Sequence, residues 1–213
     1  MIEYTIVSTG SVGNCVIIDK KIMVDVGVSY VKVKPYMDDV KLVLLTHRHI
    51  DHFKPSTVRR MSLEKPKLVF GCAPFMVAPL VEAGVAKSRI VVMQQNYMYG
   101  FGICNVIPFD VYHDVPNVGY KIHFPHGKVF YATDTGSLAG ITATDYDLYL
   151  VEANYEDDEI KARMDAKREQ GLYPYEQRAL KYHLSKKQCD EWLVKNMRGK
   201  GEYVYLHCHV EKT

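Results

Sequence analysis

The chain has 213 residues and a formal net charge of +2, from 27 Lys and Arg residues against 25 Asp and Glu residues. Hydrophobic residues make up 47% and charged residues 24% of the sequence, which is typical of soluble globular proteins. This composition excludes collagen-like, low-complexity and wholly disordered chains. The near balance of charges gives little sequence-independent attraction for a long nucleic acid, so a small substrate is favoured as the partner.

The sequence shows no sign of a membrane segment. Its longest apolar runs, such as residues 42–45, are far shorter than the roughly 20 residues that a membrane helix needs. The N-terminal residues also lack the basic and apolar regions of a secretory signal. We therefore expect a cytoplasmic protein with no membrane partner.

Short runs rich in β-branched and aromatic residues recur along the chain and predict strands. In chain order they are residues 4–7, 15–18, 22–26, 42–45, 68–70, 90–93, 106–111, 120–124, 129–132, 148–151 and 203–206. Longer helical patterns predict helices near residues 56–62, 75–83, 156–169 and 185–197, the last with Ser185 as its N-cap. No repeat or linker divides the sequence, so we expect one layered α/β domain over residues 1–213.

Charge is distributed unevenly near the C-terminus. Residues 140–160 carry seven acids and no bases, whereas residues 161–200 carry eleven bases and five acids. A helix with acids in its first turn and bases towards its last turn would explain most of this pattern, and we favour that explanation. The alternative is a phosphate-binding stripe.

The densest group of polar side chains directly follows the predicted strand at residues 42–45. The segment Thr-His-Arg-His-Ile-Asp-His places His47, His49, Asp51 and His52 within six residues. His47 and His49 can point the same way from an extended segment, and Asp51 and His52 can point towards a neighbouring position. This geometry suits two metal ions side by side, and the alternative is an ordinary solvated loop.

Other candidate residues also follow predicted strands, where α/β sheets commonly build their sites. They are His113, Asp134, Glu152 and His207. The histidines that lack this placement are His123, His126 and His209, although His209 is too close to His207 to be set aside.

These motifs together resemble the metallo-β-lactamase-fold hydrolases. The His-x-His-x-Asp-His segment, Asp25 in Val-Asp-Val-Gly, His113, Asp134 in Ala-Thr-Asp-Thr-Gly and the late His207 occur in the order of that family. The resemblance implies an α/β fold with the four-layer αββα sandwich of the metallo-β-lactamases.

Further motifs are similar to the YycJ-like branch, which is related to tRNase Z and to the phage anti-Pycsar phosphodiesterases. They lie at residues 10–15, 113–120, 152–154, 173–175 and 183–185. The chain departs from this branch at Tyr155 and Glu156, where His-Asp is usual, and at Cys208 and His209, where Leu-Ser is usual. We also expect no β-CASP domain of the kind found in larger nucleases. No segment of the sequence resembles the tRNA-grasping arm of tRNase Z.

The resemblance assigns a role to each candidate residue. His47, His49 and His113 would hold one metal ion, Asp51, His52 and His207 the other, and Asp134 would bridge both. Asp25 would orient the loop that carries the histidines. Two Zn²⁺ per chain are the expected cofactors, with Mn²⁺ as the alternative.

The resemblance also implies catalytic residues, which are Asp51, His183 and Glu152. His183 would donate a proton to the leaving oxygen, and Glu152 would hold its imidazole in orientation. The alternative for His183 is a histidine in a helix-capping loop next to Ser185.

The function implied is a dinuclear-metal phosphodiesterase that hydrolyses a nucleotide, with a cyclic mononucleotide favoured as in the anti-Pycsar enzymes. The runner-up is a YycJ-like DNA exonuclease or another nuclease, which would make nucleic acid the partner. Hydrolysis of a β-lactam or thioester ranks third, and a non-catalytic binding module ranks last. The resemblance further implies a homodimer.

Overall fold

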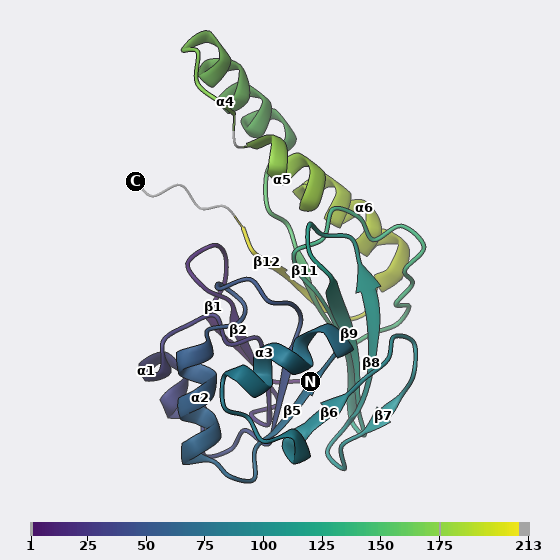
Figure 1. Cartoon of the computed structure of the whole chain (residues 1–213). Coiled ribbons are helices and arrows are strands. Elements are labelled where there is room, and N and C mark those ends of the chain that lie inside the picture. Colours follow the sequence, from purple (N-terminus) through teal and green to yellow (C-terminus); the bar gives the residue numbers. More distant parts are fainter. Residues whose placement is uncertain (1, 175, 209–213) are drawn as a thin grey trace. The chain divides into compact units, whose positions relative to one another are not determined.

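The computed structural model describes residues 2–174 and 176–208. The chain divides into two compact units, Met1–Phe109 and Asp110–Thr213. Mixed β-sheet and helices make up both units (Figure 1).

The sheet of the first unit has the strand order β1-β2-β3-β4-β5-β6. Its strands are β1 (Tyr4–Ser8), β2 (Cys15–Ile18), β3 (Ile22–Val24), β4 (Leu42–Leu45), β5 (Val69–Cys72) and β6 (Ile90–Val92). The first three strands pair antiparallel and β3 to β6 pair parallel. Strands β2, β3 and β4 are buried at every position, so they appear in the sequence as continuous apolar runs rather than alternating ones.

The α-helices of the first unit bury some of their apolar side chains in its core. They are α1 (Tyr30–Val33), α2 (Pro55–Glu64) and α3 (Val77–Glu82), with the short 3₁₀ helices η1 (Lys34–Tyr36), η2 (Pro74–Met76) and η3 (Lys87–Arg89). Pro55 starts α2, where the missing N–H costs nothing. Val58 and Met61 of this helix are fully buried in one cluster with Phe70 of β5.

Strands β7 to β12 belong to a second sheet, which in the second unit runs β12-β11-β10-β9. They are β7 (Tyr99–Gly100), β8 (Asn105–Val111), β9 (Asn117–Phe124), β10 (Gly127–Ala132), β11 (Leu148–Glu152) and β12 (Glu202–Leu206). β9 and β10 form an antiparallel hairpin, and β10, β11 and β12 pair parallel.

The second unit carries α4 (Asp157–Glu169), α5 (Glu176–Tyr182) and α6 (Lys186–Met197). Ser185 caps α6, as predicted, in a reciprocal pair of hydrogen bonds with Gln188. Trp192 of α6 stacks on Phe130 of β10 at 4.6 Å between ring centroids, which fixes the helix against the sheet. α4 extends away from α6 and the sheet (Figure 1).

Every strand predicted from the sequence is present within a few residues of its predicted bounds. The two-residue strand β7 and the helices α1 and α5 were not predicted, because each is too short to show a clear period. The predicted helix at 75–83 is the 3₁₀ turn η2 followed by α3.

The charges of α4 follow the favoured prediction. Asp157, Asp158 and Glu159 lie in its first turn and Lys167 and Arg168 in its last. Several bases of this region form ion pairs: Lys167 with Glu176 at 2.5 Å, Arg168 with Asp165 at 3.1 Å and Lys186 with Glu156 at 2.8 Å. This pairing weakens the alternative of a phosphate-binding stripe.

Among the helices in the described part of the chain, none combines the length and the apolar character needed to cross a membrane.

Neighbouring parallel strands end at the same edge of their sheet, so the polar side chains that follow them lie close together. β3 and β4 end at Val24 and Leu45, so Asp25 and Thr46 follow at one edge of the first sheet. In the second unit Asp134, Glu152 and His207 lie at or just beyond the carboxyl ends of three parallel strands. Loops diverge at such edges while the strands hold them rigidly.

Candidate metal and catalytic centres

Asp25 organises the cluster in the first unit. Its carboxylate is fully buried and accepts hydrogen bonds from Thr46 N and Thr46 Oγ1, both at 2.9 Å. It also pairs with His52 Nδ1 at 2.7 Å. Asp25 adopts a left-handed φ of 60° directly after β3, a conformation that non-glycine residues rarely adopt and that clusters at functional sites.

The hydrogen bonds indicate which nitrogen of each histidine can bind a cation. Thr46 Oγ1 donates its single proton to Asp25 and therefore accepts from His47 Nδ1, 3.0 Å away. His52 likewise uses Nδ1 to donate to Asp25. In both imidazoles Nε2 is therefore the nitrogen without a proton, and in this structure it faces His49 Nδ1 in His47 and Asn14 Nδ2 in His52.

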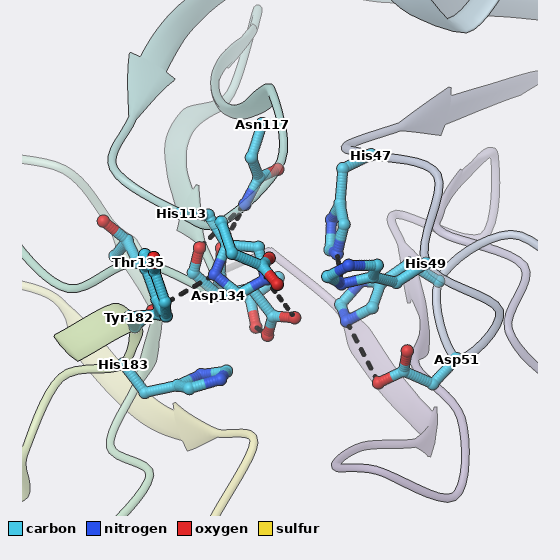
Figure 2. Close-up of polar contacts among 12 residues, drawn as sticks. His47, His49, Asp51, His113, Asn117, Asp134, Thr135, Tyr182 and His183 are labelled. Carbon is cyan, nitrogen blue, oxygen red and sulfur yellow. Dashed lines mark hydrogen bonds and ion pairs between the residues drawn. The ribbon is translucent and has the colours of Figure 1, made fainter. Parts of the chain in front are cut away.

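The imidazoles of this cluster converge. His47 Nε2 lies 3.0 Å from His49 Nδ1, and Figure 2 shows the ring of His47 directed at that of His49. The rings of His47 and His52 are 4.2 Å apart between centroids. Asp51 Oδ2 lies 3.7 Å from His52 Nε2. Imidazole nitrogens and carboxylate oxygens are the donors that zinc and similar ions prefer, so these four side chains are of the kind that binds a metal ion.

Two residues that were not predicted as site residues hold this loop in place. Asn14 donates from its backbone N–H to Asp51 O at 2.6 Å, and its Nδ2 lies 2.7 Å from His52 Nε2. Gly27 allows the close approach of the loop, because a Cβ at this position would lie 1.7 Å from Asp51 O. Asn14 lies in the motif Gly-Ser-Val-Gly-Asn-Cys at residues 10–15. This motif was the feature of the sequence that could have identified Asn14 as a site residue.

Asp134 leads the cluster in the second unit. It follows β10 with a left-handed φ of 52°, and Asn117 Nδ2 holds its backbone by donating to Asp134 O at 2.8 Å and to Thr133 O at 3.1 Å. His113 Nε2 lies 3.7 Å from Asp134 Oδ2. The other nitrogen of His113 lies 3.2 Å from Tyr182 O, at the end of α5 (Figure 2). Asn117 was not predicted as a site residue, although it belongs to the motif at residues 113–120.

Glu152 is the fully buried carboxylate of the second unit. It accepts a hydrogen bond from Thr135 N at 2.7 Å and pairs with His183 Nδ1 at 2.6 Å. His207 Nδ1 lies 3.2 Å from the same carboxylate and also contacts Asp134 Oδ1. One acid therefore positions two histidines.

Burial and neighbouring polar groups have opposite effects on the pKa values of His207 and Glu152. Burial alone would lower the pKa of His207, but the negative charges of Asp134 and Glu152 outweigh it and raise the pKa to about 10. Burial alone would raise the pKa of Glu152, but the hydrogen bonds to His183 and His207 outweigh it and lower the pKa below its usual value. These contacts therefore favour the charged forms of His207 and Glu152.

His183 lies in the short segment between α5 and α6. It follows α5, and Leu184 O accepts from Asn154 N at 2.9 Å, which ties the segment to the end of β11. Ser185 alone provides the side-chain cap of α6, while His183 points to Glu152. The helix-capping alternative therefore does not describe the His183 side chain.

The second-unit cluster can hold a metal ion. Asp134, Glu152, His183 and His207 offer ligand atoms that all lie within 4.8 Å of one another. The site residues predicted from the sequence thus gather in two groups, one in each unit. His47, His49, Asp51 and His52 make up the first group, and His113, Asp134, Glu152, His183 and His207 make up the second.

A sequence model of the beta-lactamase superfamily domain matches residues 21–207. The chain belongs to this superfamily. No curated protein sequence matches it significantly.

Solved structures of the fold are similar over nearly the whole chain. The metallo-beta-lactamase fold protein YhfI from Bacillus subtilis is 16% identical, with a TM-score of 0.76, covering 99% of this chain and 88% of that chain. The short form of human tRNase Z is 16% identical, with a TM-score of 0.72 and coverage of 98% and 93%. A diphosphatase of the PhnP family is 13% identical, with a TM-score of 0.66 and coverage of 98% and 87%.

The predicted α/β fold class of the metallo-β-lactamase superfamily is confirmed by these matches and by the two mixed sheets with their helices. The His and Asp residues that gather at the strand ends are those of the superfamily-like motifs in the sequence.

Of the remaining histidines, His123 and His126 do not join these groups. His123 lies within the β9–β10 hairpin, where its Nε2 is 2.9 Å from the hydroxyl of Tyr146. His126 is exposed at the turn of that hairpin. His209 lies outside the described residues.

Proposed function

We propose that this chain is a dinuclear-metal phosphodiesterase that hydrolyses a nucleotide, with a cyclic mononucleotide as its substrate. The observation that carries the proposal is the pair of His183 and Glu152, whose Nδ1 and Oε1 lie 2.6 Å apart beside Asp134 and His207. A histidine held by a buried carboxylate at a metal-binding cluster is suited to protonate an alkoxide leaving group.

The metal ions would be held by the predicted ligands. His47, His49 and His113 would hold one ion, Asp51, His52 and His207 the other, and Asp134 would bridge them. We propose two Zn²⁺ per chain, because imidazole nitrogens dominate the set, with Mn²⁺ as the alternative. When bound, the ions supply Lewis-acid charge for the phosphoryl oxygens and make water acidic enough to attack near neutral pH.

The protein's own residues would donate the proton to the leaving group and position the metal ligands. His183 uses Nδ1 for Glu152, so Nε2 is the nitrogen that donates a proton to the leaving oxygen. The negative charge of Glu152 stabilises the protonated imidazole before this transfer. Asp25 and Thr46 keep His47 and His52 in the tautomers that can bind a cation. Asp51 acts at the same centre as a ligand carboxylate.

The proposed substrate, cellular location and oligomeric state rest on the resemblance to the YycJ-like branch, which includes the anti-Pycsar enzymes. The net charge of +2 supports a small substrate over a long polyanion. The ion pairs that neutralise bases around α4 support it further. We propose a cytoplasmic homodimer, in line with that branch.

A nuclease is the second candidate. It is supported by the similarity to human tRNase Z, whose name states action on tRNA, and by the diphosphatase neighbour, whose name states action on a diphosphate. The motifs shared with YycJ-like proteins, such as His-Leu-Ser at residues 183–185, support the same class.

Product chromatography separates the two candidates. Metal-loaded protein and an Asp51→Ala control are incubated with 3′,5′-cyclic CMP, UMP, AMP and GMP, and with a 5′-phosphorylated single-stranded DNA. Linear nucleotides from the cyclic substrates alone, absent in the control, would support the cyclic-nucleotide phosphodiesterase. Shortened DNA with intact cyclic nucleotides would move the assignment to the nuclease, and no product from either would contradict both.

A further inference from the structure

Four donor side chains of the second unit form a set that needs no ligand from the first unit. Asp134, Glu152, His183 and His207 offer ligand atoms that all lie within 4.8 Å of one another. A tetrahedral zinc ion holds nitrogen and oxygen ligands at about 2.0–2.1 Å, which places the donors about 3.4 Å from each other. Glu152 Oε1 lies 2.6 Å from His183 Nδ1 and 3.2 Å from His207 Nδ1. The set is therefore close to the dimensions of a zinc site.

This set shares only part of its residues with the proposed dinuclear centre. Asp134 and His207 belong to both, whereas Glu152 and His183 belong to the second-unit set alone. A neutral imidazole has a single nitrogen lone pair, so His207 can bind only one ion at a time. The second-unit set and the complete dinuclear centre are therefore alternative ways to bind zinc.

Charge and burial favour the second-unit set for the first zinc ion that binds. The side chains of Asp134 and Glu152 are 2% and 0% exposed, so two carboxylates face one ion away from water. In the first unit, hydrogen bonds already occupy the buried carboxylate of Asp25, and the side chain of Asp51 is 21% exposed. Attraction between opposite charges is stronger in a buried site than in water.

An ion in this set would prevent His183 from acting as a proton donor. Donation near neutral pH needs the imidazolium form, in which both ring nitrogens carry protons. The nitrogen that faces Glu152 is Nδ1, and an ion bound there takes the place of its proton. The neutral ring that results keeps the remaining N–H too firmly to protonate a leaving group.

We propose that the first zinc ion to enter the protein binds Asp134, Glu152, His183 and His207, and that this singly loaded form is an inactive resting state. The inference rests on the proposed function and adds regulation of its centre by zinc supply. Formation of the dinuclear centre withdraws Asp134 and His207 from the set. Glu152 and His183 alone are too few to hold a zinc ion, so His183 becomes the proton donor only at full loading.

Nuclear magnetic resonance of isotope-labelled histidine side chains tests the order of binding in the wild-type protein. We expect the ring signals of His183 and His207 to shift with the first equivalent of zinc, and those of His47 and His49 with the second. The His183 signal should leave its zinc-bound position as the second equivalent binds. Signals of His47 and His49 that shift first, with His183 unchanged, would overturn the proposal.

Competition with a chromophoric chelator measures the affinity for each ion in variants. For His183→Asn we expect the affinity for the first ion to fall by at least about tenfold, because a ligand is lost. His49→Asn should keep the affinity for the first ion and lower that for the second. His126→Asn, an exposed histidine outside the set, is the matched control and should change neither. An unchanged affinity of His183→Asn for the first ion would overturn the proposal.

Two further measurements guard these comparisons. Circular dichroism checks that each variant is folded. With zinc in excess, His183→Asn should still bind two ions, because the proposed dinuclear centre does not use His183. A variant that binds only one ion would contradict the division of ligands between the two arrangements.

The binding measurements need no turnover, so they separate this inference from the proposed function. A first ion captured by the second-unit set in a protein that cleaves no phosphodiester would support the site and contradict the proposed function. Phosphodiesterase activity that rises in proportion from the first equivalent of zinc would retain the proposed function and overturn the resting state.

Discussion

In the first unit the fully buried carboxylate of Asp25 orients one imidazole, that of His52, and otherwise accepts hydrogen bonds from Thr46. In the second unit the equally buried Glu152 pairs with two imidazoles, those of His183 and His207. Both acids lie at the carboxyl end of a strand. In the proposed mechanism the two acids therefore differ: Asp25 would support only metal ligands, whereas Glu152 would support a metal ligand and the proton donor.

The largest expected effect follows from the double role of Glu152. A Glu152→Gln substitution keeps the shape but removes the charge that holds both histidines. We expect kcat for a cyclic nucleotide to fall by about 10³-fold or more, because proton donation and metal binding are both weakened. Steady-state kinetics at saturating zinc measures this loss. A decrease in kcat of less than tenfold would mean that Glu152 has no catalytic role.

Substitution of His183 should affect rate without affecting metal. For His183→Asn we expect kcat to fall by about 10²-fold or more while the zinc content per chain stays unchanged, since the proton donor alone is lost. The loss should be smallest for an aryl phosphodiester, whose leaving group needs little protonation. The exposed His126 provides the matched control, because His126→Asn lies outside both clusters. Equal losses on alkyl and aryl substrates would argue against proton donation by His183.

Asp25→Asn should show the opposite pattern. The substitution weakens the hydrogen bonds to Thr46 and His52, so we expect zinc affinity to fall by about 10- to 100-fold. Excess zinc should then restore most of kcat. Competition with a chromophoric chelator measures the affinity, and a loss of kcat that zinc does not restore would mean that Asp25 acts beyond orienting ligands.

The smallest effect concerns stability of the metal-free protein. The pKa of His207 is raised to about 10, so its ion pair stabilises the fold fully below the unfolded pKa of about 6.5 and loses this contribution as the pH rises towards 10. We expect the free energy of unfolding to fall over this window by at most about 1.4 kcal/mol per pH unit. Urea denaturation at pH 6.5, 8 and 10 tests this.

In a His207→Gln variant the same denaturation series should lose most of its slope. An unchanged slope would show that another group is responsible for the pH dependence.

Strand-end placement made much of both clusters predictable. Apolar runs located β4, β10, β11 and β12, and the polar residues that follow them are the ones that gather in each unit. The left-handed conformations of Asp25, Asp134 and His207 were not predictable, because only the surrounding packing enforces a backbone that these residues disfavour.

The motifs at residues 10–15 and 113–120 contain two of the supporting residues, but the contacts of these residues could not be predicted from the sequence. The amides of Asn14 and Asn117 bind backbone atoms of residues distant in sequence, and no local pattern encodes such contacts. The position of His183 depends on α5, which is too short to predict from periodicity.

We propose that two metal ions and the His183–Glu152 pair make this chain a phosphodiesterase. The most direct test of this proposal titrates zinc into metal-free protein and follows, in the same samples, bound zinc per chain and hydrolysis of bis(4-nitrophenyl) phosphate. We predict two bound zinc ions per chain and activity that appears with the second. Saturation at one ion per chain, or an inactive protein with two ions bound, would contradict the account.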